Sequence, residues 1–149
     1  MEPNREQLLD FLAAVDADFP TPLSSRTALP AYADKLLQFA TLCADMENGE
    51  IRALVAGYTD NLPGDMAYIA LAATRRAHRR QGHARRLVRA FLEICAQKEI
   101  SAVHLYTDPS NAAALALYRS LGFEPYRPEA EPRPADSHWI YRLKGENKP

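Results

Sequence analysis

Seven arginines lie between positions 75 and 89, in a chain whose formal net charge is only −1. They flank Gly82, and they are Arg75, Arg76, Arg79, Arg80, Arg85, Arg86 and Arg89. Arginines donate charge-assisted hydrogen bonds, and an anion can approach a glycine backbone closely because no Cβ atom stands in the way. Acidic residues outnumber basic ones over the rest of the chain, so the pattern indicates one site for a polyanionic ligand rather than general adhesion to nucleic acid.

The residues that follow Gly82 favour a helix that begins at this site. Apolar side chains recur at helical spacing over residues 82–98, and they are Ala84, Leu87, Val88, Phe91, Leu92 and Cys95. A helix N-terminus presents unpaired backbone N–H groups and a partial positive charge, and both suit phosphate. The two common nucleotide loops, GxxxxGK[ST] and GxGxxG, are absent, which excludes P-loop hydrolases and the usual dinucleotide fold.

Hydrophobic periodicity predicts the elements that must position this loop. Helices are expected over 5–15, 31–40, 82–98 and 111–122, and strands over 40–47, 50–59, 67–74, 102–108 and 137–143. Asn4 is expected to cap the first helix, and Asn48-Gly49 to form a tight hairpin turn because both residues tolerate positive φ. The stretches 16–30 and 125–134 are predicted loops. This order predicts one domain over 1–149 with a mixed α/β (α+β) sheet.

Two segments, in this order, resemble the GNAT superfamily of N-acetyltransferases. The first is AYIALAATRRAHRRQGHARRLV, in which residues 79–84 read R-x-x-G-x-A. The second is LYTDPSNAAALALYRSLGFEPY, with Asn111, Tyr118 and a Leu-Gly-Phe ending. The resemblance covers residues 68–126 and, more weakly, the Asn-Gly hairpin. It implies a GNAT-like acyl-CoA acyltransferase fold with splayed central strands, here with two N-terminal helices.

The resemblance also implies acetyl-CoA as acyl donor and a role for each matching position. The strand 67–74 would carry a β-bulge and pair with the pantetheine arm through the backbone of Ala72, Ala73 and Thr74. The pyrophosphate would meet the side chains of Arg79, Arg80 and Arg85, and it would accept hydrogen bonds from the backbone N–H groups of Gln81, Gly82, His83, Ala84 and Arg85. The next strand would splay away. Asn111 would bind the pantetheine, and Tyr118 would protonate the leaving thiolate.

Simpler interpretations of the same residues stay open. Tyr118 lies on an apolar helix face and can be a packing residue, and Asn111 can be only a helix cap. Most of the arginines can belong to a solvated basic face. Trp139 and Tyr141 can line an acceptor cleft or pack in the core. The first strand usual in the family is hard to find, which leaves the acceptor side undefined.

The expected reaction moves an acetyl or other acyl group from acetyl-CoA to a primary amine of a small molecule or peptide, by direct attack in a ternary complex. A non-catalytic acyl-CoA-binding sensor, an O-acetyltransferase acting on a hydroxyl, and a basic nucleic-acid or protein adaptor are the alternatives. Neither the acceptor nor the acyl chain length follows from the residues. The general base stays unassigned, because none of the acids beside the predicted acceptor-side strands stands out, namely Asp45, Glu47, Asp60 and Asp65.

Composition favours a cytoplasmic protein without a metal or a membrane anchor. Cys43 and Cys95 lie far apart in apolar contexts and read as buried thiols. The four histidines lack metal-site spacing. No apolar run approaches the roughly 20 residues of a membrane span, and the charged N-terminus lacks the apolar stretch of a signal peptide. No nucleic-acid reader motif accompanies the arginines, so no nucleic-acid partner is expected, while a homodimer stays open.

Overall fold

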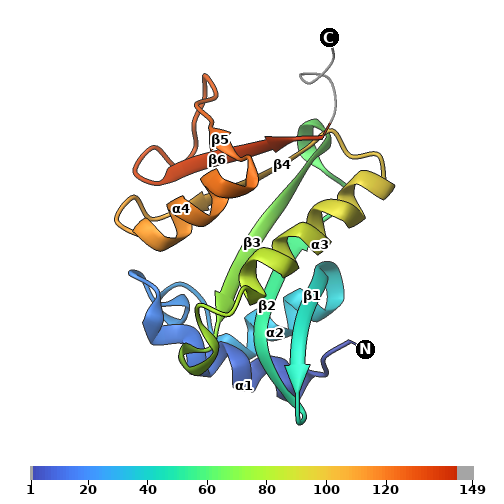
Figure 1. Ribbon diagram of the computed structural model, residues 1–149, viewed down its shortest axis with the longest axis vertical. Coiled ribbons are helices and arrows are strands. Elements are labelled where there is room, and N and C mark those ends of the chain that lie inside the picture. Colours follow the sequence, from blue (N-terminus) through green and yellow to red (C-terminus); the bar gives the residue numbers. More distant parts are fainter. Residues whose placement is uncertain (1, 144–149) are drawn as a thin grey trace.

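The computed structural model describes residues 2–143 and confirms the expected mixed sheet (Figure 1). The helices are α1 (Arg5–Val15), α2 (Leu29–Phe39), α3 (His83–Gln97) and α4 (Ala112–Leu121). The strands are β1 (Thr41–Glu47), β2 (Glu50–Tyr58), β3 (Met66–Thr74), β4 (Ala102–Thr107), β5 (Glu124–Pro125) and β6 (Ser137–Arg142). The strand order is β1-β2-β3-β4-β6-β5; β3 and β4 run parallel, and the other neighbours run antiparallel.

Helices cover both faces of this sheet. The amphipathic stripes cause the layering, because each helix must bury its apolar face against the strands. α1 buries Leu8, Phe11, Leu12 and Val15 in a core shared with α2 and β2, while α3 buries Val88, Phe91, Leu92 and Cys95 on the other face. None of the described helices has the length and apolar character needed to cross a lipid bilayer.

Local signals in the sequence set the predicted ends of the elements. The Asn4 side chain accepts a hydrogen bond from the Gln7 backbone at 2.8 Å, and the Gln7 side chain accepts one from the Asn4 backbone at 2.9 Å. This reciprocal capping box starts α1 where it was expected. Asn48 and Gly49 have φ of 52° and 78°, and Glu47 pairs with Glu50, which confirms the tight hairpin.

The structure corrects the expectation for α2 and adds a short strand. α2 begins two residues early, at Leu29, because Pro30 fits the first turn of a helix, where its missing N–H costs nothing. Its buried residues are Ala33 and Leu36, whereas the equally apolar Leu37 and Phe39 are 36% and 59% exposed. Each helical residue turns by about 100°, so Leu37 and Phe39 lie on opposite edges of the stripe that Ala33 and Leu36 bury. The predicted 125–134 loop begins inside β5, which pairs with β6.

β3 carries the two irregularities that open the sheet. Gly57 pairs with Ile69 and Ala56 pairs with Leu71, so Ala70 is the extra residue of a β-bulge, as the resemblance implied. The β3–β4 ladder ends at Ile69↔Leu105, and the rest of β4 pairs only with β6. β4 and β6 therefore diverge from the C-terminal half of β3 (Figure 1). This divergence leaves residues 70–74 without a strand partner on the β4 side.

Candidate active site

A cavity of about 510 Å³ lies where β3 and β4 separate. One wall is β3 from Tyr68 to Ala72, a second is the end of β4 with α4, and a third is the chain segment 19–35 that leads into α2. Residues of this third wall, which we call the acceptor end, are Phe19, Pro20, Thr21, Leu23, Arg26, Thr27, Ala31, Tyr32 and Lys35. The segment that connects α1 to α2, together with α2 itself, thus takes part in shaping the acceptor side.

Three of the predicted site residues line this cavity together. They are Ala72 on β3, Asn111 at the start of α4 and Tyr118 within α4. Ala73 and Thr74 continue β3 beyond the cavity toward the loop that ends at Gly82. A ligand that lies along the open edge of β3 would therefore meet the backbone first and the predicted loop at the far end.

Tyr118 is a core residue and a cavity residue at once. Its side chain is 6% exposed, and its ring packs edge-on against Phe123 with centroids 5.4 Å apart. Its hydroxyl makes no hydrogen bond with the described residues. Burial raises the pKa of Tyr118 to about 12, so the hydroxyl keeps its proton at neutral pH and can act only as a donor of that proton.

Asn111 caps α4 and retains further hydrogen-bonding capacity. Its side-chain oxygen accepts a hydrogen bond from the Ala114 backbone at 3.2 Å, which fixes the side chain at the cavity wall. The side-chain amide nitrogen has no partner among the described residues. An amide has two N–H donors, so Asn111 can cap its helix and donate into the cavity at the same time.

Gly82 adopts a left-handed conformation at the start of α3. Its φ is 82° and its ψ is 8°, which favours glycine strongly. No side chain caps this helix, and the first intrahelical bond runs from Arg86 N to Gly82 O at 3.1 Å. The backbone N–H groups of His83, Ala84 and Arg85 therefore have no acceptor within the helix, which is the arrangement that binds phosphate.

The predicted phosphate-binding arginines differ in what they contact. Arg79 donates to Asp18 Oδ2 at 2.6 Å and to the Thr74 carbonyl at 3.0 Å, so its guanidinium already has protein partners. Hydrogen bonds from Arg76, together with the charge of Arg79, hold the pKa of Asp18 below its usual value. Arg85 donates to Ser120 Oγ at 2.8 Å, which joins α3 to α4. Arg80 has no partner among the described residues.

The side chain of His83 anchors the loop, a role that its sequence position does not reveal. The ring is buried, with Nδ1 2.9 Å from Asp45 Oδ2 on β1 and Nε2 3.0 Å from Gln81 Oε1. Arg52 also reaches Asp45, with Nη2 2.9 Å from Oδ2. Only the tertiary fold brings β1 beside the start of α3, so no spacing along the chain predicts these contacts.

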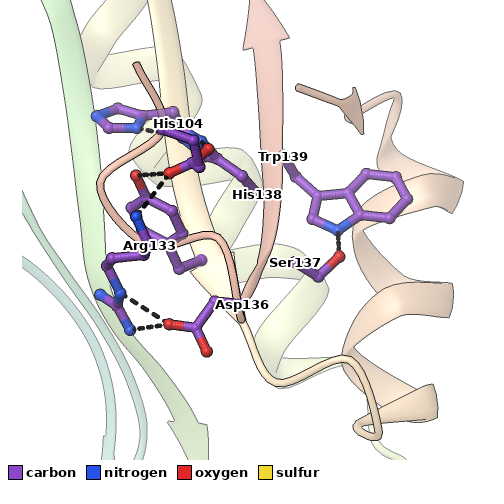
Figure 2. Close-up of polar contacts among 8 residues, drawn as sticks. His104, Arg133, Asp136, Ser137, His138 and Trp139 are labelled. Atoms are coloured by element: carbon purple, nitrogen blue, oxygen red, sulfur yellow. Dashed lines mark hydrogen bonds and ion pairs between the residues drawn. The ribbon is translucent and has the colours of Figure 1, made fainter. Parts of the chain in front are cut away.

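A hydrogen-bonded group joins the segment between β5 and β6 to β4 and β6 (Figure 2) and contributes Tyr106 and Arg133 to the cavity wall; these contacts were not predicted. Tyr106 donates to Glu131 Oε1 at 2.8 Å, and Glu131 Oε2 lies 2.7 Å from His138 Nδ1. His138 Nε2 is 2.8 Å from His104 Nδ1. Arg133 stacks over Tyr106, with Cζ 4.4 Å from the ring centroid. These contacts hold the segment against β4 and β6.

The same group has shifted protonation equilibria. Burial, together with neighbouring His138, lowers the pKa of His104 to about 4. Burial alone would raise the pKa of Glu131, but hydrogen bonds from Arg133 N–H, His138 and Tyr106 outweigh it and hold the pKa at about 2. Burial and the bond to Glu131 raise the pKa of Tyr106 to about 12. At neutral pH the group thus contains a carboxylate, a neutral His104 and a protonated tyrosine.

The four acidic residues that were weighed as a general base have other partners. Asp45 and Glu47 pair with Arg52, and Asp60 pairs with Lys98 at 2.9 Å. Asp65 accepts a hydrogen bond from Ser101 Oγ at 2.6 Å. None of the four lines the cavity.

Two aromatic residues were considered for the cleft. Trp139 is 3% exposed and belongs to the core, and Tyr141 packs against the same core. Neither residue lines the cavity. Figure 2 shows Trp139 on the opposite side of β6 from His138.

Cys43 and Cys95 are buried, and burial raises the pKa of each thiol to about 11. Among the described residues, no group of three or more metal-ligating side chains is placed to hold an ion.

The comparison with protein families decides the identity of this fold. The profile described as the acetyltransferase (GNAT) family matches residues 9–123, which is most of the chain. The chain belongs to the GNAT acetyltransferase family. Acyl transfer from acetyl-CoA is the chemistry of this family, and the resemblance seen over residues 68–126 is confirmed. No curated protein sequence matches the chain.

Solved acetyltransferase structures share the GNAT fold over nearly the whole chain. A GNAT acetyltransferase from Staphylococcus aureus Mu50 has a TM-score of 0.76 at 16% identity, over 97% of this chain and 98% of that one. The PaiA N-acetyltransferase from Thermoplasma acidophilum, solved with coenzyme A, gives 0.77 at 9% identity, over 95% and 96%. The ribosomal-protein-S18-alanine N-acetyltransferase from Escherichia coli gives 0.68 at 21% identity, over 94% and 92%.

Proposed function

We propose that this GNAT acetyltransferase moves an acetyl group from acetyl-CoA to a primary amine of a small molecule or peptide, by direct attack in a ternary complex. The observation that carries the proposal is the open edge of β3. Residues 70–74 lack a strand partner on the β4 side, line or approach the cavity, and lead to an uncapped helix start at Gly82. A long ligand with a peptide-like arm and a pyrophosphate needs that sequence of contacts.

The residues present fit such a donor. The backbone of Ala72, Ala73 and Thr74 offers strand-like hydrogen bonds to the two amides of a pantetheine arm. The free N–H groups at residues 81–85 suit the pyrophosphate, and Arg80 and Arg85 lack carboxylate partners that would compete for their charge. Arg79 contributes through the same loop only if its guanidinium leaves Asp18, which it contacts at 2.6 Å.

The proposed chemistry uses the bulge and α4. The neutral amine attacks the thioester carbon with its lone pair, and the nitrogen, which becomes positively charged as the C–N bond forms, then gives up one proton to a base or to water. Backbone N–H groups of the bulged strand would stabilise the oxyanion, because they are fixed before the charge develops. As the C–S bond breaks, Tyr118 would donate its hydroxyl proton to the departing sulfur, giving free coenzyme A and an amide. Asn111 would hold the pantetheine beside this hydroxyl.

The test is acetyl-CoA-dependent thiol release with a panel of amines, with product mass measured for each. We expect release that requires an amine and yields an acetylated product 42 Da heavier, the mass that replacing hydrogen by acetyl adds. In parallel, acetyl-CoA at 100 times its dissociation constant should stabilise the fold by about 2.7 kcal/mol, seen as a raised melting temperature.

The alternatives give different results in the same two measurements. A sensor would show the thermal shift with no acceptor-dependent release. An O-acetyltransferase would acetylate hydroxyl compounds and leave amines unchanged. Absence of any thermal shift at millimolar acetyl-CoA would contradict the proposal at its first step.

A further inference from the structure

The acceptor end of the cavity carries two cations that no acidic residue of the described chain neutralises. Arg26 precedes α2 and Lys35 lies on α2, and both line the cavity with exposed side chains. Neither makes an ion pair or a side-chain hydrogen bond with the described residues. The Lys35 ammonium instead lies over the Tyr58 ring, 5.7 Å from its centroid.

The other charged residues on the cavity wall have partners within the protein. Arg133 Nη2 is 2.6 Å from Asp136 Oδ2, which balances one cation with one anion. Asp108, on the α4 side, accepts hydrogen bonds from the backbone and the hydroxyl of Ser110, at 2.8 and 2.6 Å. Asp108 thus has only neutral partners and keeps its negative charge on the α4 side, whereas the acceptor end carries the unpaired positive charges of Arg26 and Lys35.

A second observation at this end is independent of the charges. The hydroxyl of Tyr58 is buried and has no hydrogen-bond partner. Tyr58 does not itself line the cavity, but it pairs directly with Tyr68 across β2 and β3, and both Tyr68 and Tyr32 line the cavity. Burial raises the pKa of both Tyr32 and Tyr58, so their hydroxyls stay protonated and act as donors. A buried donor without an acceptor is costly, so an acceptor atom that reached this hydroxyl would stabilise it.

We propose that the acceptor end binds the carboxylate of the acyl acceptor, so that the substrate is a small amine that also carries an acid group, as a free amino acid does. Arg26 and Lys35 supply the charge, and the tyrosine hydroxyls supply neutral donors. The inference rests on the proposed acyl transfer and adds the substrate class. A polyamine does not fit, since its second ammonium group would meet two cations.

Anchoring the acid group has a consequence for the reaction. The carboxylate is held at the wall opposite the β3–β4 opening, so the amine of the same molecule is directed toward the thioester end of the donor. Binding energy from a part of the substrate that does not react is then used to orient the part that does. Decarboxylated amines should therefore lose turnover number as well as affinity.

The experiment compares matched acceptors with acetyl-CoA at a fixed saturating concentration. Free amino acids, their carboxamides and their decarboxylated amines form one series, and phosphoethanolamine serves as the phosphate-bearing amine. We expect kcat/KM of the best free amino acid to exceed that of its carboxamide and its amine by roughly 10- to 100-fold. Equal turnover of the amine, or preference for phosphoethanolamine over every amino acid, overturns the inference while leaving acyl transfer to amines intact.

Substitutions test whether Arg26 and Lys35 are the residues that bind the carboxylate of the acceptor. Arg26→Gln and Lys35→Gln should each raise KM for the best amino acid by roughly 10-fold and leave KM for acetyl-CoA unchanged. The matched control is Arg89→Gln, which removes an exposed arginine that has no partner and does not line the cavity. If the two variants raise KM for acetyl-CoA instead, these cations serve the donor and the inference fails.

Tyr58→Phe separates binding from folding. Because the hydroxyl is unsatisfied in the free protein, its removal should leave the melting temperature unchanged or raise it. The same change should raise KM for the best amino acid several-fold. A lowered melting temperature with an unchanged KM would show a structural hydroxyl and would count against the proposal.

Discussion

The two ends of the Tyr118 side chain have different surroundings. Its ring packs against Phe123 in the core, while its hydroxyl makes no hydrogen bond with the described residues and the residue lines the cavity. Helical periodicity could predict only the packing. The proposed proton donation depends on α4 standing beside the β3–β4 opening, which is a property of the assembled sheet.

Replacing Tyr118 with phenylalanine should lower kcat by roughly 10- to 100-fold with little change in the dissociation constant of acetyl-CoA. The ring is retained, so core packing stays intact, and only the proton donor is lost. Calorimetry and steady-state kinetics measure the two quantities. Tyr126→Phe is the control, since Tyr126 lies outside the cavity and its hydroxyl has no partner among the described residues. Wild-type kcat in the Tyr118 variant would assign this tyrosine to packing alone.

Gly82→Val should abolish acetyl-CoA binding while the protein remains folded. A Cβ atom at this position would meet only Arg86 Nη1, at 4.0 Å, so the cost arises from the φ of +82° and not from a clash. We expect a loss of about 1–2 kcal/mol in stability, because β-branched residues resist this conformation. Thermal unfolding and calorimetry with acetyl-CoA measure both effects.

Gly64→Val is the matched control for this change. Gly64 has a φ of +62° with open space around its Cβ position and lies far from the loop in sequence. It should lose similar stability and bind acetyl-CoA normally. Equal affinity in both variants would mean that the pyrophosphate does not approach Gly82.

Some residues of the proposed site could be predicted from the sequence, and others could not, for a physical reason. Gly82 and Asn111 act through helix ends, which are local structures with local signals in the sequence. Tyr106, Glu131 and His138 come together only when β4, β6 and the segment between β5 and β6 assemble. Spacing along the chain carries no information about such contacts, so this part of the site became visible only in the structure.

At the scale of elements, β3 is the strand on which the site depends. It pairs with β2 along its length and with β4 over only four residue pairs, from Met66↔Ala102 to Ile69↔Leu105. Its many small side chains, noted in AYIALAAT, leave space close to the backbone. The elements themselves were predictable from periodicity, whereas the phase of α2 was not, because Leu37 and Phe39 are as apolar as the residues that it buries.

Gly57→Ala should destabilise the protein by about 1–3 kcal/mol, because α3 packs directly on β2 at this point. The new Cβ atom would overlap the Phe91 ring and lie 2.7 Å from the Tyr68 carbonyl oxygen. Urea unfolding measures the change. The double variant Gly57→Ala with Phe91→Leu should show a smaller total loss than the sum of the single losses, since the shorter side chain relieves the overlap. Additive losses would contradict direct contact.

At the scale of the whole molecule, charge is arranged in separate regions. Four of the seven clustered arginines pair with acids elsewhere in the chain: Arg75 with Asp10, Arg76 and Arg79 with Asp18, and Arg86 with Asp45. The first three pairs join the loop before α3 to α1 and to the turn after α1, and the fourth joins α3 itself to β1. The arginine cluster therefore stabilises the loop as well as offering a positive surface, a function that composition alone did not suggest.

The group formed by His104, His138 and Glu131 should make the stability of the fold depend on pH. The pKa of His104 is lowered to about 4 in the folded protein, against about 6.5 for an unfolded chain. The unfolded state therefore binds more protons below pH 6.5, so stability falls as the pH drops from about 6.5 to 4. The loss should reach about 1–2 kcal/mol, because partial exposure of the ring to solvent reduces the effect of burial.

A second decline should follow from Glu131, whose pKa is lowered to about 2 by its hydrogen bonds. Its contribution is present above an unfolded pKa of about 4.3 and is lost as the pH falls from there toward 2. Urea unfolding of the wild type and of His104→Gln, measured between pH 7.5 and 3, separates the two steps. In the His104→Gln variant the decline in stability between pH 6.5 and 4 should be absent, because glutamine does not titrate. The decline at lower pH that comes from Glu131 should remain. If the free energies of unfolding of the two proteins change in parallel over that range, protonation of His104 does not cause the loss of stability, and another group must take up the proton.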